Sequence, residues 1–126
     1  MLCGDFNVRL RSDDDDGVHI GRHIFEKHAR DGLDELPGII ENRELFTKEL
    51  MEHDLIATNT FFHTIPSKLI TYKENKQHEG GPPFDRKNYD TLDYILIQQR
   101  WRNAVTNVES YMDSGINSDH YPLLSK

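Results

Sequence analysis

The feature that most constrains this chain is a short apolar run, Leu92 to Ile97, with a carboxylate at its second position. The run is rich in aliphatic, β-branched and aromatic residues, which predicts a strand. Within such a strand the carboxylate of Asp93 would be half buried. Removing a charge from water is costly unless the charge is paired, so Asp93 needs a partner from elsewhere in the chain. The fold must therefore bring a distant polar residue to the start of this strand.

Shorter patterns predict the other regular elements. Phe46 and Leu50 stand four residues apart in a charged stretch, which predicts an amphipathic helix over Ile39 to His53. Glu44 and Lys48 have the spacing of an ion pair on that helix. Runs of β-forming residues predict strands at Met1–Phe6, which we expect to be buried, and at Leu55–Thr60, Lys68–Tyr72, Val105–Tyr111 and Tyr121–Leu124.

Glycine-rich and polar stretches predict two long loops. Residues 9–38 read as loop, with one short helix near Ile24–Ala29, and residues 73–89 read as a polar loop. Strands combined with one clear helix predict an α/β or α+β layered domain.

Composition bounds the class of protein. The 126 residues suffice for one domain, and 15 Lys and Arg against 22 Asp and Glu give a net charge of −7. No apolar run approaches the roughly 20 residues of a membrane helix, and no secretory signal pattern is present. A single Cys allows a reducing compartment, so we expect an intracellular protein, nuclear or cytoplasmic. The negative charge disfavours a general nucleic-acid binder unless basic residues or metal ions are focused at one place.

Polar residues gather at three separate points of the predicted strands. Asp5 and Asn7 follow the first strand, Asp93 lies in the strongest one, and Ser118-Asp119-His120 precedes the last. Strand ends and the loops beside them are where rigid scaffolds place catalytic groups. Each cluster alone is also compatible with an ordinary turn, and only the fold could bring the three together.

In this order, Gly4-Asp5-Phe6-Asn7, Leu92-Asp93-Tyr94-Ile95-Leu96 and Ser118-Asp119-His120 resemble the signatures of the endonuclease/exonuclease/phosphatase superfamily. The resemblance is closest to the endonucleases of non-LTR (LINE-type) retrotransposons and their domesticated relatives of the craniofacial development protein type. There, segments like Asp54–Phe62, Leu69–Tyr72 and Arg100-Trp101-Arg102 recur in the same order.

The resemblance implies a metal-dependent phosphodiester hydrolase that nicks DNA with Mg²⁺ or Mn²⁺. Asp5 would orient or deprotonate the attacking water, and Asn7 would hold the water or the scissile phosphate. Asp93 would pair with His120 and keep its imidazole protonated, so that His120 contacts a phosphate oxygen. The resemblance further implies that Asp119 lies at the metal or positions the histidine, and that Thr71 and Ser118 bind the phosphate or the site.

Three further patterns have simpler structural explanations. Asp13 to Gly17 resembles a calcium loop, but the ligand positions of an EF-hand fall on unsuitable residues, which favours a solvated loop. His19, His23 and His28 have the spacing of a metal site, yet no further ligands complete it, which favours a chance cluster. For Trp101 we favour a structural cap on the preceding strand over stacking on nucleic acid. In the loop 73–89, basic side chains are candidates for phosphate contact: Lys73, Lys76, Arg86 and Lys87.

The resemblance also implies a fold and its extent. Residues 1–126 would form the C-terminal half of a DNase I-like four-layer α/β sandwich, a mixed β-sheet with flanking helices. The half that carries the metal-binding Glu would be absent, so we expect weakened metal affinity and weak or no activity alone. One sheet face would be left open, which predicts an exposed apolar patch and self-association, or docking of the missing half. The alternative is a non-catalytic remnant or a domesticated binding module derived from a retrotransposon.

Overall fold

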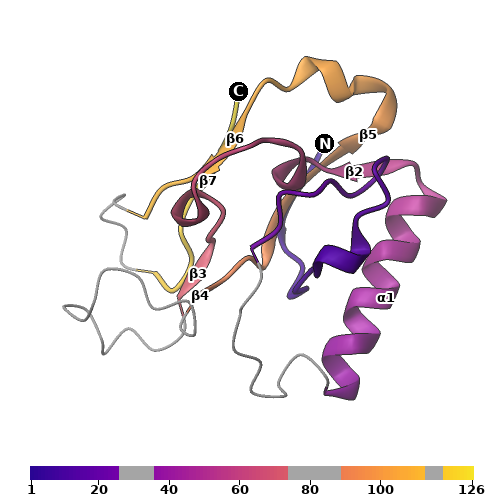
Figure 1. Ribbon diagram of the computed structural model, residues 1–126, viewed down its shortest axis with the longest axis horizontal. Helices are drawn as coiled ribbons and strands as arrows, with labels where there is room; N and C mark the ends of the chain where they lie inside the picture. The colour runs from indigo at the N-terminus through magenta and orange to yellow at the C-terminus, as the bar shows by residue number, and fades with distance from the viewer. Residues whose placement is uncertain (26–35, 74–88, 113–117) are drawn as a thin grey trace.

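The computed structural model describes residues 1–25, 36–73, 89–112 and 118–126 (Figure 1). Its central sheet is antiparallel, with β5 (Asp93–Gln98) between β1 (Leu2–Asp5) and β2 (Leu55–Ala57). The register pairs Asp5 with Asp93 and Leu2 with Leu96 across β1 and β5. Tyr94 to Ile97 are buried on this middle strand, which confirms the strongest strand prediction. The content is mixed α/β with antiparallel sheets and few helices.

Helix α1 (Pro37–Glu52) covers one face of this sheet (Figure 1). Pro37 at its first turn has the backbone torsion that a helix start needs, and Asp54 in the left-handed region (φ +51°) turns the chain into β2. Phe46 and Leu50 are buried, as their spacing predicts. The ring of Phe46 lies 5.1 Å from that of Tyr94 and 5.4 Å from that of Phe6, which anchors the helix on the sheet.

Short elements fill the rest of the described chain. Two small antiparallel sheets are formed by β3 (Tyr72–Lys73) with β4 (Tyr89–Asp90), and by β6 (Val108–Ser110) with β7 (Leu123–Ser125). The 3₁₀ turns are η1 (Ser12–Asp14), η3 (Thr58–Phe61), η4 (Pro66–Lys68) and η7 (Gln99–Ala104). A second apolar cluster is formed by Phe25, Leu69, Ile70 and Tyr89, the last of which lies in β4.

Several predicted strands are shorter than their patterns. The strand from Leu55 ends at Ala57 because η3 turns the chain away, and Pro66 starts a 3₁₀ turn that delays β3 to Tyr72. Likewise η7 delays β6 to Val108. The helix pairs Lys48 with Glu52 (3.7 Å), whereas the expected partner was Glu44. β4 was not predicted.

The N-terminal strand was expected to be buried, and that expectation was wrong. All four residues of β1 are exposed because, in the described structure, the strand lies at the sheet edge with β5 as its neighbour. Beside it, an apolar groove of about 680 Å³ runs between α1 and the sheet, lined by Leu2, Leu45 and Phe46 among others. The expected apolar patch on an open sheet face and self-association both stay predictions.

Other predictions fall at the limits of the described chain. Trp101 lies in η7, the turn that follows β5, and is 56% exposed, and its role as a structural cap stays a prediction. The helix near 24–29, His28 and the basic residues Lys76, Arg86 and Lys87 lie wholly or mostly outside the described residues. Among the described residues, no helix is long and apolar enough to cross a membrane.

Candidate functional site

The pairing of β1 with β5 brings two carboxylates together. Asp5 ends β1 and Asp93 begins β5, and the register places them directly opposite each other. Neighbouring carboxylates repel each other, so this pair attracts a cation or a protonated base. The sequence predicted both residues as site members but gave no register.

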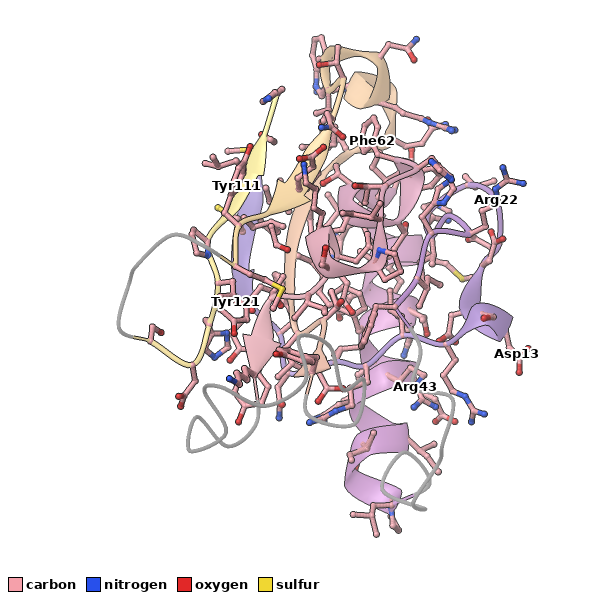
Figure 2. The ribbon with its side chains drawn as sticks, turned by 60° about the vertical axis from the view of Figure 1, so that its left-hand side comes forward. Asp13, Arg22, Arg43, Phe62, Tyr111 and Tyr121 are labelled. Carbon is pink, nitrogen blue, oxygen red and sulfur yellow. The ribbon has the colours of Figure 1, made fainter. Side chains whose placement is uncertain are left out.

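His120 is carried to these carboxylates by the segment 118–121, which pairs with the start of β3. The Tyr121 N–H donates to the Thr71 carbonyl (2.8 Å), and the Lys73 N–H donates to the Asp119 carbonyl (2.9 Å). Between these bonds, Tyr72 and His120 form a β-bridge and their rings lie 5.2 Å apart. Figure 2 labels Tyr121, the residue after His120, beside this part of the sheet. The sequence did not single out Tyr72, because no local pattern marks a residue that meets a histidine 48 positions later.

The three side chains form one compact cluster, which we call the Asp5–Asp93–His120 cluster. His120 Nδ1 lies 2.8 Å from Asp93 Oδ2, and Nε2 lies 3.6 Å from Asp5 Oδ2. A carboxylate only accepts hydrogen bonds, so Nδ1 carries the proton and donates it to Asp93. The contact to Asp5 is longer than a hydrogen bond. One potential ligand atom from each residue lies within 4.8 Å of the others.

The cluster is open to solvent on the side of Asp5. The side chain of Asp93 is 18% exposed, that of His120 36%, and that of Asp5 46%. Asp93 therefore works from the protein side to orient the imidazole, while Asp5 and Nε2 face an accessible space. Such an arrangement suits a carboxylate–histidine pair with a ligand on its outer side.

Two predicted residues shape the loops beside the cluster. Asn7 is exposed, and its N–H donates to Asp5 Oδ1 (2.8 Å) while its backbone takes the left-handed region (φ +51°). Asn tolerates that conformation well, so this turn sets the direction of the Asp5 carboxylate. Ser118 Oγ accepts the N–H of His120 (3.2 Å), which fixes the turn that presents the imidazole. Contact of Asn7 or Ser118 with a phosphate stays a prediction.

Thr71 is placed behind the cluster. It is fully buried, and its Oγ1 accepts the N–H groups of Leu92 (2.9 Å) and Asp93 (3.1 Å). Its main chain also bonds Asp90 and Tyr121. Thr71 thus joins the strand of Asp93 to the segment of His120, and its contact with a phosphate stays a prediction.

Asp119, the residue expected at the metal, lies outside the cluster. It is exposed, and its carbonyl rather than its carboxylate is used to pair with Lys73. Metal binding by Asp119 therefore stays a prediction. A second group with ligand spacing, Glu49, Glu52 and His53, is exposed at the C-terminal end of α1.

A second histidine with two carboxylates lies at the other edge of the sheet, and we call it the Asp16–His19–Asp54 cluster. His19 Nδ1 lies 2.9 Å from Asp16 and Nε2 lies 3.0 Å from Asp54. Asp16 Oδ1 also accepts the N–H groups of Val18, His19 and Ile20. The His19 carbonyl accepts the Ala57 N–H, which ties the loop to β2.

These contacts shift two pKa values. Burial alone would raise the pKa of Asp16, but the hydrogen bonds from Ile20, Val18 and His19 outweigh it and lower the pKa to about 2. Burial would lower the pKa of His19, whereas the bonds to Asp16 and Asp54 raise it above its usual value. The acidic run was expected to be a solvated loop and the histidines a chance cluster. Asp13, Asp15 and Asp16 are exposed, as a solvated loop requires, and the contact between Asp16 and His19 helps to hold this loop. That the histidines do not form a joint metal site stays a prediction.

Comparisons with known proteins give a distant similarity. No protein-family model matches the chain. Over 112 aligned residues, 82% of the chain, it is 29% identical to craniofacial development protein 2 of Bos taurus and 27% identical to the protein of the same name from Tragulus javanicus. The chain spans only 17% and 18% of the length of these relatives. The chain therefore has homologues named craniofacial development protein 2.

Proposed function

We propose that the chain carries part of a divalent-metal-dependent phosphodiester hydrolase of the retrotransposon-endonuclease type, which nicks DNA. The observation that supports it best is the convergence of Asp5, Asp93 and His120 from three separate segments. Each residue was expected at the site from short sequence signatures. A DNase I-like half-fold belongs to the same proposal.

The donor set suits a hard divalent cation. Carboxylate oxygens are the ligands that Mg²⁺ and Mn²⁺ prefer, and Asp5 and Asp93 supply them here. Asp5, the most exposed member of the cluster, is the carboxylate best placed to hold the ion, which would otherwise keep water ligands. When bound, such an ion neutralises phosphate charge and makes water more acidic. With so few protein ligands we expect weak affinity, on the order of 10⁻⁴ M or poorer.

The remaining chemistry comes from the chain itself. Asp93 holds the Nδ1 proton of His120 and so fixes the ring with Nε2 facing the open side of the cluster. When protonated, Nε2 donates to a non-bridging phosphate oxygen as charge develops there. The Asp5 carboxylate, directed by the Asn7 N–H, orients the attacking water. Because the chain carries a net charge of −7, a bound cation would favour the approach of a polyanion.

One observation favours a second candidate, a domesticated module without catalysis. The two relatives carry a name that refers to development and not to a nuclease. In that case the cluster would bind a metal or a phosphate without hydrolysing it. Metal binding without nicking would therefore support the second candidate over the first.

The test combines nicking with direct metal binding. Supercoiled plasmid is incubated with the purified chain and Mn²⁺ or Mg²⁺, and Mn²⁺ binding is followed by water proton relaxation. We expect Asp5→Asn, Asp93→Asn and His120→Ala each to lower the rate of nicking by at least about 100-fold, while His19→Ala retains it. Equal nicking by all the variants would mean contamination and would overturn the catalytic proposal. Because the exposed group on α1 could also bind Mn²⁺, the titrations use a His53→Ala background.

A further inference from the structure

β2 pairs only with the C-terminal half of β5, so in the described part of the chain the half of β5 that begins at the candidate site has no strand beside it on that edge. The pairing of β2 with β5 runs from Leu55 opposite Gln98 to Ala57 opposite Leu96, and there it stops. The chain turns into η3, although the backbone groups of Ile95 and Asp93 on that edge still need partners. Within the described residues, no neighbouring strand therefore pairs with the main chain of Asp93 on this edge of β5.

Side chains replace the missing strand. Thr58 Oγ1 donates to the Ile95 carbonyl (2.7 Å), and Asn59 Oδ1 accepts the Ile95 N–H (3.1 Å). Asn59 Nδ2 donates to the Asp93 carbonyl (2.9 Å), and Thr71 Oγ1 accepts the Asp93 N–H (3.1 Å). All four polar backbone groups of Ile95 and Asp93 are therefore bonded to side chains.

Asn59 has the chemistry that this position requires. Its carboxamide offers one acceptor and one donor side by side, as a peptide group does, and so continues the ladder for one more step. It is 3% exposed, so water cannot take over either bond if the side chain is lost. Both of its bonds are to main chain, one of them to Asp93 itself.

We propose that Asn59 is a positioning residue of the Asp5–Asp93–His120 cluster, which fixes the backbone of Asp93 and hence the Asp93–His120 hydrogen bond. The hydrogen bonds of Asn59 reach the main chain of β5, so Asn59 acts through the backbone of Asp93. A bond of 2.8 Å between a carboxylate and an imidazole is sensitive to small displacements of the strand. The relevance of this inference to catalysis rests on the proposed function, whereas its geometric content does not.

A matched variant separates positioning from general stability. Thr58→Val also removes one buried hydrogen bond from the same edge, but that bond ends on Ile95, two residues from Asp93. Asn59→Leu keeps the approximate shape and removes both bonds. Both variants should lose stability, and we expect only Asn59→Leu to disturb the cluster.

The readout is the Nδ1–H proton of His120, observed in the metal-free chain by ¹H–¹⁵N NMR. We expect a slowly exchanging signal in the unsubstituted chain and in Thr58→Val, and its loss in Asn59→Leu. In the His53→Ala background, we expect the Kd for Mn²⁺ to rise about tenfold with Asn59→Leu and less than twofold with Thr58→Val. If Asn59→Leu does not fold, Asn59→Ser replaces it, with loss of the signal again expected.

The outcomes distinguish the two proposals. An Nδ1–H signal that persists in a folded Asn59 variant overturns the positioning role, as does its absence from the unsubstituted chain. If the unsubstituted chain binds no Mn²⁺, the proposed metal site fails, and the NMR signal alone decides the role of Asn59.

Discussion

Two clusters of one histidine and two aspartates lie at opposite edges of the central sheet in the part of the chain that the structure describes. In the Asp16–His19–Asp54 cluster both ring nitrogens form hydrogen bonds. In the Asp5–Asp93–His120 cluster only Nδ1 does, and Nε2 stands 3.6 Å from the second carboxylate. The same three residue types therefore leave different bonding capacity for a ligand.

The two clusters differ in how many of their hydrogen-bond donors and acceptors are already paired within the protein. The carboxylate oxygens of Asp16 accept hydrogen bonds from three backbone N–H groups and contact His19, so Asp16 stabilises a loop and has few free acceptor positions for a metal. Asp5 accepts one backbone N–H from Asn7 and remains nearly half exposed. Residue type alone does not mark a site; unused donors and acceptors that face a common space do.

The largest expected effect distinguishes the two histidines by function. His120→Ala should lower the rate of plasmid nicking by at least about 100-fold, the usual contribution of a positioned acid or base. The free energy of unfolding should change by less than about 1 kcal/mol, because the side chain is partly exposed. The rates of nicking with Mn²⁺ and urea unfolding curves measure the two quantities.

His19→Ala is the matched control, and it should reverse the pattern. Nicking by the folded protein should stay within twofold, while stability falls by about 1 kcal/mol. If His19→Ala abolishes nicking as His120→Ala does, the functional distinction between the clusters fails.

The next effect is on the stability of the loop. Asp16→Ala leaves the N–H groups of Val18, His19 and Ile20 without their acceptor and should cost about 2 kcal/mol of unfolding free energy. Asp13→Ala, in the same acidic run and exposed (Figure 2), should change it by less than about 0.5 kcal/mol. Equal urea midpoints for the two variants would contradict the structural role of Asp16.

The pKa of Asp16 also gives this loop an acid dependence. Because its folded pKa is lowered to about 2, the stabilisation is present above its unfolded pKa of about 3.8 and is lost as pH falls toward 2. Asp16→Ala should remove that part of the acid destabilisation, which urea unfolding between pH 2.5 and 5 can measure.

His19 should give a smaller dependence at higher pH. Its folded pKa is raised, so its contribution is complete below the unfolded pKa of about 6.5 and is lost as pH rises through the folded value. Relative to His19→Gln, the unsubstituted chain should lose about 1 kcal/mol across that window, because the Asp54 partner is largely exposed. A difference that grows with pH would reverse the sign and contradict the assignment.

Local patterns predicted the elements that depend on near neighbours. The strand around Tyr94 to Ile97 and helix α1 were confirmed, because the pattern of buried apolar residues in such an element can be read from residues close together in sequence. The exposure of β1 was not predictable, since it depends on whether a neighbouring strand lies beside it. Strand ends were missed where Thr58 and Pro66 begin 3₁₀ turns.

The same limit applies to the sites. Asp93 was expected to need a partner, and a half-buried carboxylate does have one, in His120. The contact of His19 with Asp54 and the bonds of Asn59 join residues 34 to 36 positions apart in sequence, which no local spacing encodes. The acidic run was compared only with the ligand positions of a calcium-binding loop. The hydrogen bonds from backbone N–H groups to Asp16 were therefore not predicted.

The smallest expected effect concerns Asp119, adjacent in sequence to His120 yet outside its cluster. If its exposed carboxylate binds the ion only weakly or through water, Asp119→Asn should raise the Kd for Mn²⁺ about twofold, compared with at least tenfold for Asp5→Asn. Asp119→Asn should leave the pairing with Lys73 in place, because that bond uses the main-chain carbonyl of residue 119. Water proton relaxation in the His53→Ala background measures both affinities. Equal losses for the two variants would make Asp119 a direct ligand and would require segment 118–121 to turn its carboxylate toward Asp5.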